Sequence, residues 1–129
     1  MSNQKIDKGA FMIARQIFES ELWLRKPSTW KVIWIYILGR VNHGPFQGLE
    51  RGEGFFNFSQ EKREIGIDVT DDMIKKFLRF ARESEMISTT RSTRGMTIKV
   101  NNYDKFQDFE AYKSTTRSTR EAREKHADK

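Results

Sequence analysis

The pattern of hydrophobic and polar positions predicts a strand followed by a long buried helix. Gly9–Phe18 mixes β-branched and aromatic residues after a glycine, which favours a strand. The next segment opens at Pro27 and Ser28, a typical helix start, and ends at Gly44. Heavy β-branching makes a strand the alternative for Val32–Leu38, but the length and the start signal favour a helix. Its apolar residues cover nearly the whole circumference, as expected of a helix at the centre of a domain: Trp30, Ile33, Trp34, Ile37, Leu38 and Val41.

Two further helices are predicted after a turn-rich loop at Gly44–Gly54. A short strand at Phe55–Ser59 leads into a helix over Gln60–Ile65, with Ser59 as its cap. After a tight connection, Thr70 caps a longer helix that runs to Glu85. One face of this helix is apolar and predicts core contact: Met73, Ile74, Phe77, Leu78, Phe80 and Ala81. The opposite face carries Lys75, Arg79 and Arg82.

A β-hairpin is predicted to follow, with strands in Met86–Thr93 and Met96–Tyr103 joined at Arg94–Gly95. This order of elements predicts an α+β fold, a winged helix-turn-helix with a three-helix core, an N-terminal strand and a β-hairpin wing. The domain is expected to span residues 9–109. Residues 1–8 are expected to form an N-terminal arm, and residues 110–129, which are almost without apolar residues, a basic and flexible tail.

Composition narrows the classes of function. The net charge of +6 and a pI near 9.7 favour an anionic partner, with nucleic acid ahead of a membrane surface. The absence of cysteine excludes disulfides and thiolate metal sites and agrees with a cytoplasmic location. His43 and His126 have no partners at ligand spacing, and no nucleophile stands beside a base. We therefore expect no metal, no cofactor, no enzymatic activity and no membrane span.

The last predicted helix carries the first group of candidate DNA contacts. In helix-turn-helix proteins the second helix of the pair enters the major groove with its N-terminal half nearest the bases. That position predicts contacts from Thr70, Lys75, Lys76 and Arg79 to phosphates or base edges. The alternative is an ordinary solvated face with Asp71–Lys75 and Asp72–Lys76 pairs, since Thr70–Glu85 holds four bases and four acids.

The predicted hairpin carries the second group: Thr90, Arg91, Thr93, Arg94 and Lys99. Arginine, lysine and hydroxyl side chains commonly donate to phosphate oxygens. The alternative is an ordinary hairpin with a polar outer face, because threonine is also a good strand former.

The heptapeptide STTRSTR occurs twice, at Ser88–Arg94 in the hairpin and at Ser114–Arg120 in the tail. The same chemistry suits phosphates in both places, so Arg117 and Arg120 are candidate contacts of a flexible tether. Two alternatives remain open: repeated DNA within the gene, and a duplication without function.

Four segments carry a resemblance to a known family: KPSTWKVIWIYILGRVNH, RGEGFFNFSQ, GIDVTDDMIKKFLRFARESEMI and MTIKVNNYDKFQ. Together they resemble the winged-helix domain of bacteriophage replication-initiation proteins, the replisome-organiser and DnaD-like N-terminal group. The resemblance implies double-stranded DNA binding, origin recognition and recruitment of a helicase or helicase loader. A transcriptional regulator on the same fold and a protein-binding adaptor without DNA affinity are the alternatives. Trp23 is a candidate contact in a homodimer.

Overall fold

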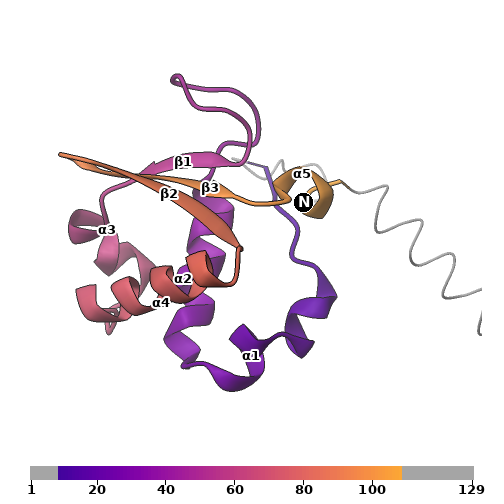
Figure 1. The fold of residues 1–129 in the computed structure, drawn as a ribbon, viewed down its shortest axis with the longest axis vertical. Coiled ribbons are helices and arrows are strands. Elements are labelled where there is room, and N and C mark those ends of the chain that lie inside the picture. Colours follow the sequence, from indigo (N-terminus) through magenta and orange to yellow (C-terminus); the bar gives the residue numbers. More distant parts are fainter. Residues whose placement is uncertain (1–8, 109–129) are drawn as a thin grey trace, which may run out of the picture.

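The computed structural model describes residues 9–108 and shows an α+β fold with five α-helices, one 3₁₀ helix and a three-stranded antiparallel sheet (Figure 1). The arrangement is compatible with a winged-helix-like fold. In chain order the elements are η1 (Arg15–Glu19), α1 (Glu21–Arg25), α2 (Ser28–Arg40), β1 (Glu53–Phe56), α3 (Phe58–Ile65), α4 (Asp71–Glu83), β2 (Ile87–Ser92), β3 (Gly95–Val100) and α5 (Tyr103–Phe106).

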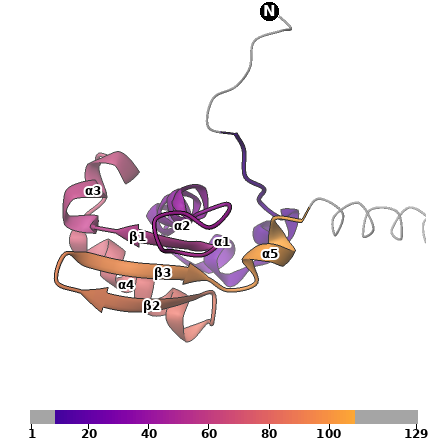
Figure 2. The same cartoon turned by 90° about the horizontal axis from the view of Figure 1, so that it is seen from above.

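The sheet lies against a layer of helices formed by α2, α3 and α4 (Figures 1 and 2). Its strand order is β1-β3-β2, so the strand before the helix pair joins the hairpin that follows it. Large apolar side chains between the two layers are fully buried, and they come from every part of this arrangement: Ile33, Ile37, Phe56, Phe77 and Ile98. The predicted helix is therefore confirmed as α2, but it is not buried all round, because only Ile33, Ile37 and Leu38 are buried and Val32 is 45% exposed.

The predicted N-terminal strand is wrong. Residues 9–14 have no regular secondary structure, and a 3₁₀ helix follows at Arg15–Glu19. Strand propensity reflects packing on a sheet, and here the large apolar side chains are only partly covered: Phe11, Ile13 and Phe18 are 38%, 41% and 55% exposed. The Phe11 ring, for example, lies against α2, where a Cβ at Gly39 would be 2.8 Å from its Cε1 atom.

The side chain of Gln107 hydrogen-bonds to the backbone of this segment, as a neighbouring strand would. The Met12 amide donates to Gln107 Oε1 at 2.8 Å, and Gln107 Nε2 donates to the Met12 carbonyl at 2.8 Å. Gln107 follows α5 and is buried, with 7% of its surface exposed. One side chain thus satisfies both backbone groups of Met12 and fixes the N-terminal segment to the end of the domain.

Gln107→Leu is expected to lower the free energy of unfolding by about 2 kcal/mol, because two hydrogen bonds of about 1 kcal/mol each are lost. Denaturant unfolding measures the loss, and the Met12 amide should exchange faster with solvent. The matched control is Gln16→Leu at an exposed position, where a change within about 0.5 kcal/mol is expected. Equal losses in the two variants would show that the Met12–Gln107 pairing contributes nothing.

Several element boundaries differ from the predictions. The first strand, β1, is Glu53–Phe56 rather than Phe55–Ser59, and α4 ends at Glu83 rather than Glu85. Helix α2 ends at Arg40 rather than Gly44, because Val41 is extended and the Asn42 amide donates to the Glu53 carbonyl at 2.8 Å. Helix α3 begins two residues earlier than expected, because Asn57, not Ser59, is its cap. The second hairpin strand ends at Val100, because Asn102 has a left-handed backbone with φ of 60°.

The predicted arm at residues 1–8 and the predicted tail at 110–129 lie outside the described residues, as do Arg117, Arg120 and His126. No helix in residues 9–108 is long and apolar enough to cross a membrane.

Candidate nucleic-acid interface

Helix α4 begins as the sequence predicts. Thr70 is extended, and its Oγ1 atom accepts from the Met73 amide at 3.2 Å, which satisfies one donor of the first turn. The apolar face predicted for this helix is confirmed: Ile74, Phe77, Leu78 and Ala81 are buried, and Met73 and Phe80 are partly buried against the core. The opposite face, with Lys75, Arg79 and Arg82, is exposed.

Thr70→Ala is expected to lower the free energy of unfolding by about 1 kcal/mol, because the first turn of α4 loses its cap. Thr70→Ser keeps the side-chain oxygen and should retain most of the stability. Thermal unfolding of the three chains followed by circular dichroism measures both effects. A serine variant as unstable as the alanine variant would contradict the capping role.

The acidic residues at the start of α4 are paired with lysines. Asp72 contacts Lys76 at 3.1 Å, which confirms one predicted pair. The predicted Asp71–Lys75 pair is wrong, because Asp71 contacts Lys62 of α3 at 3.1 Å. This ion pair joins the two helices, and in the described part of the chain Lys75 has no carboxylate partner. The exposed cations of α4 are therefore less neutralised than the residue count suggested.

The hairpin directs its candidate residues to two different faces. Residues directly opposite each other in an antiparallel pair share a face of the sheet. Arg91 pairs with Met96, whose side chain faces the helices and is buried, so Arg91 projects on the helix side. Thr90 pairs with Thr97 on the outer face, and Thr93 and Arg94 form the turn. Arg91 is exposed because it lies near the hairpin turn, beyond the core.

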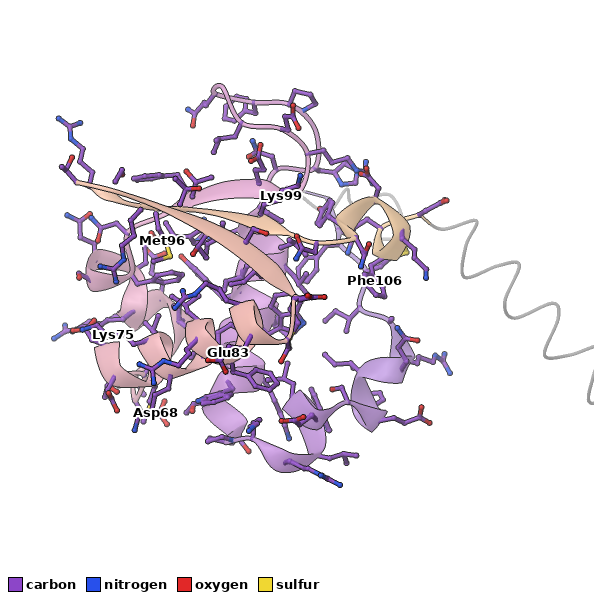
Figure 3. All side chains as sticks on the ribbon, viewed as in Figure 1. Asp68, Lys75, Glu83, Met96, Lys99 and Phe106 are labelled. Atoms are coloured by element: carbon purple, nitrogen blue, oxygen red, sulfur yellow. The ribbon has the colours of Figure 1, made fainter. Side chains whose placement is uncertain are left out.

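Lys99 is separated from the other candidates. It pairs with Ser88 at the end of the hairpin farthest from the turn, about 16 Å along the strand from Arg94 at 3.3 Å per residue. Figure 3 shows Lys99 toward α5, whereas Lys75 lies on the side of the hairpin turn. The structure therefore brings only part of the predicted set together.

Four exposed cations lie on α4 and the β2–β3 hairpin, and of these Lys75 lies on the side of the hairpin turn (Figure 3). We call them the basic surface: Lys75, Arg79, Arg91 and Arg94. In the described residues none of the four forms an ion pair within 4.0 Å. Glu83 lies about two turns along α4 from Lys75, roughly 12 Å away along the axis, but only one turn from Arg79, so it partly compensates the charge on the helix side of this surface.

Sequence reasoning missed two residues of α3 that adjoin this surface. Lys62 positions the helix pair through its contact with Asp71. Arg63 is exposed, and no carboxylate pairs with it in residues 9–108. Both lie in the last turn of α3, directly before the connection to α4. Their place at the end of the first helix of the pair was the signal that could have revealed them.

Helix α3 is held against α2 by a tyrosine. Tyr36 of α2 donates from its hydroxyl to Glu61 Oε1 at 2.6 Å and to Glu64 Oε2 at 3.3 Å. Burial and the hydrogen bond to Glu61 both raise the pKa of Tyr36 far above its ordinary value, so the phenol stays a hydrogen-bond donor at neutral pH. The relative placement of the helices that carry the candidate contacts is thus fixed by polar as well as apolar contacts.

The predicted core role of the tryptophan stripe agrees with the packing. Trp30 and Trp34 are partly buried, and their rings lie 6.0 and 6.1 Å from the Phe77 ring. Trp23 is half-buried, and it contacts the Phe18 ring and the Lys31 ammonium group. The contacts of Trp30 and Trp34 with Phe77 join α2 to α4 on the face of α4 that is turned to the core.

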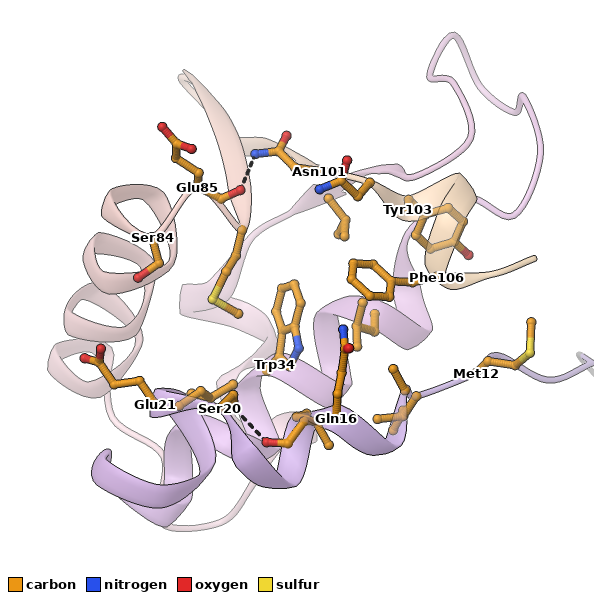
Figure 4. Close-up of a pocket in the computed structure, with 18 of the residues that line it drawn as sticks. Met12, Gln16, Ser20, Glu21, Trp34, Ser84, Glu85, Asn101, Tyr103 and Phe106 are labelled. Carbon is orange, nitrogen blue, oxygen red and sulfur yellow. Dashed lines mark hydrogen bonds between the residues drawn. The ribbon is translucent and has the colours of Figure 1, made fainter. Parts of the chain in front are cut away.

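A cavity of about 650 Å³ lies between the N-terminal segment, α2 and α5 (Figure 4). Its lining is mainly apolar and includes Met12, Trp34, Met86 and Phe106. Of the candidate DNA contacts in the described chain, none lines this cavity. The cavity and the basic surface are therefore formed by different residues.

Within residues 9–108, no group of three or more histidine, cysteine, aspartate or glutamate side chains is placed to hold a metal ion. No protein-family model, curated protein or solved structure matches this chain.

Proposed function

We propose that this protein binds double-stranded DNA as a winged helix. The N-terminal half of α4 would enter the major groove, while the β2–β3 hairpin holds the flanking phosphate backbone or the minor groove. Lys75 in that half and Arg79, one turn further along α4, serve the first contact, and Arg91 and Arg94 serve the second.

One observation carries the proposal: the basic surface is exposed and forms no ion pair in the described chain, while Asp71 and Asp72 at the start of α4 are paired with Lys62 and Lys76. Unpaired cations on one side of a domain attract a polyanion and release its counterions on binding. The helix order supports the same reading, because a tight connection joins α3 to α4 and a hairpin follows.

The biological setting that we propose is initiation of bacteriophage DNA replication, with origin recognition and recruitment of a helicase or helicase loader. It rests on the resemblance of the four quoted segments to replication-initiation proteins. Regulation of transcription by the same DNA-binding surface is the second candidate. The exposed basic surface favours both of these over an adaptor without DNA affinity.

Selection of bound fragments from random and phage genomic DNA by the purified chain tests the proposal. Recovery of repeated sites within a replication region supports initiation, and recovery of promoter sites supports regulation. The affinity for a selected duplex should fall steeply with salt. If each of the four cations neutralises one phosphate, the slope of log affinity against log salt is about −3.6. A chain that shifts no duplex at 50 mM salt would contradict DNA binding.

A further inference from the structure

The connection between α3 and α4 presents an apolar side chain to solvent. Ile67 is 99% exposed, although Ile65 and Val69, two residues to either side, are buried at 7% each. A hydrogen bond of 3.1 Å from the Val69 amide to the Gly66 carbonyl closes a four-residue turn. Ile67 and Asp68 occupy the two central positions of this turn.

An isoleucine has no local reason to occupy this position. Central turn positions are dominated by glycine, proline, asparagine, aspartate and serine, each of which favours the turn backbone. Ile67 gains nothing from the core either, because almost all of its surface is in water. Single exposed apolar residues are common on proteins, so the place of this one matters more than its exposure.

The turn that carries Ile67 is held firmly at both ends. The Gly66 amide donates to the Lys62 carbonyl at 3.2 Å, and the Lys62 ammonium group contacts Asp71 at 3.1 Å. Thr70 then caps α4 directly after the turn. Ile67 is therefore presented in a fixed position three residues before the helix cap, next to the end of α4 that is proposed to enter the major groove.

We infer that Ile67 contacts the 5-methyl group of a thymine and thereby helps to select the DNA site. This inference rests on the proposed function. Thymine is the base that places a methyl group in the major groove, and apolar side chains read it by direct contact. The charged residues of the basic surface attract any duplex, so an apolar contact beside them supplies discrimination that phosphate contacts lack.

A protein partner is the other class of molecule that an exposed isoleucine can contact. DNA is favoured because the residue lies four residues before the start of α4, a helix whose Lys75 has no carboxylate partner in the described chain. An isolated apolar side chain also offers far less area than a stable protein interface buries.

The test replaces each thymine of a selected site, one at a time, by deoxyuridine, which lacks the 5-methyl group. The full chain should lose about fourfold in affinity at one or two thymines, the effect of one buried methyl group. Ile67→Ala should bind thymine and deoxyuridine equally at those positions, and Ile67→Leu should restore part of the difference. Because the side chain is exposed, both variants should unfold at nearly the same urea concentration as the natural chain.

Leu24→Ala is the matched control, since Leu24 is 66% exposed on α1, away from the hairpin turn (Figure 1). It should keep the full loss on removal of the methyl group. Equal losses in the natural chain and in Ile67→Ala, or selection that yields no preferred thymine, would overturn the inference and leave DNA binding intact. A chain that binds no duplex would overturn the proposed function as well.

Discussion

Replacing Arg91 and Arg94 together by alanine is expected to weaken binding to duplex DNA about a hundredfold at low salt. Each arginine is proposed to donate to a phosphate, and a hydrogen bond between charged groups contributes about tenfold in affinity. The slope of log affinity against log salt should become shallower by about two, one for each lost phosphate contact. Fluorescence anisotropy of a labelled duplex at several salt concentrations measures both quantities.

The matched control removes the same charge elsewhere. Arg15 and Arg25 are exposed on η1 and α1, away from the hairpin turn. Their double alanine variant should bind with nearly the natural affinity and salt slope. If the two double variants lose affinity equally, the net charge and not the hairpin governs binding, and the role given to Arg91 and Arg94 is wrong.

Phe77→Ala is expected to lower the free energy of unfolding by about 4 kcal/mol, which is a large part of the stability of a typical domain. Phe77 is fully buried, and its ring lies 6.0 Å from Trp30 and 6.1 Å from Trp34. Removing it opens a cavity between α2 and α4 that neighbouring side chains fill only in part. Urea unfolding followed by tryptophan fluorescence measures the loss, because two of the three tryptophans border the site.

Phe46→Ala is the control for this variant, since Phe46 is 63% exposed in the loop before β1. A change of about 0.5 kcal/mol or less is expected there. A Phe77→Ala chain that unfolds at nearly the natural urea concentration would contradict the placement of this ring between α2 and α4.

The helices with strong periodic patterns could be predicted from sequence. The apolar face of α4 is continuous through Ile74, Phe77 and Ala81, and the cap at Thr70 is an unambiguous start signal. The alternation of Met96, Ile98 and Val100 likewise marked β3 as half-buried. In these segments, local propensity and tertiary packing favour the same structure.

The N-terminal region could not be predicted, because its structure depends on a partner far along the chain. The segment around Met12 pairs with the side chain of Gln107, which lies 95 residues later. Nothing in the local pattern of Gly9–Phe18 signals that contact. The short helices α1 and α5 were missed for a related reason, since elements of five and four residues are too short to show a period.

The residue types of the candidate site could be predicted from the sequence. Their ion-pair partners and the directions of their side chains could not. Arg91 and Arg94 were chosen correctly as exposed cations, but only the strand register shows that Arg91 projects on the helix side and Thr90 on the outer face. The partner of Asp71 was missed because Lys62 belongs to another helix. The i,i+4 pattern predicts contacts within one helix and not contacts between helices. Ile67 was not among the predicted contacts, because an apolar residue near the start of a helix is normally interpreted as part of the core.

Mapping amide chemical shifts by NMR during titration with duplex DNA tests the role of the basic surface most directly. The largest chemical-shift changes are expected in Ile67–Arg79 and Arg91–Gly95. The amides of η1, of α1 and of the residues lining the cavity beside α5 should change little. Shifts confined to the cavity, or no shifts at DNA concentrations well above those of the protein, would contradict that role.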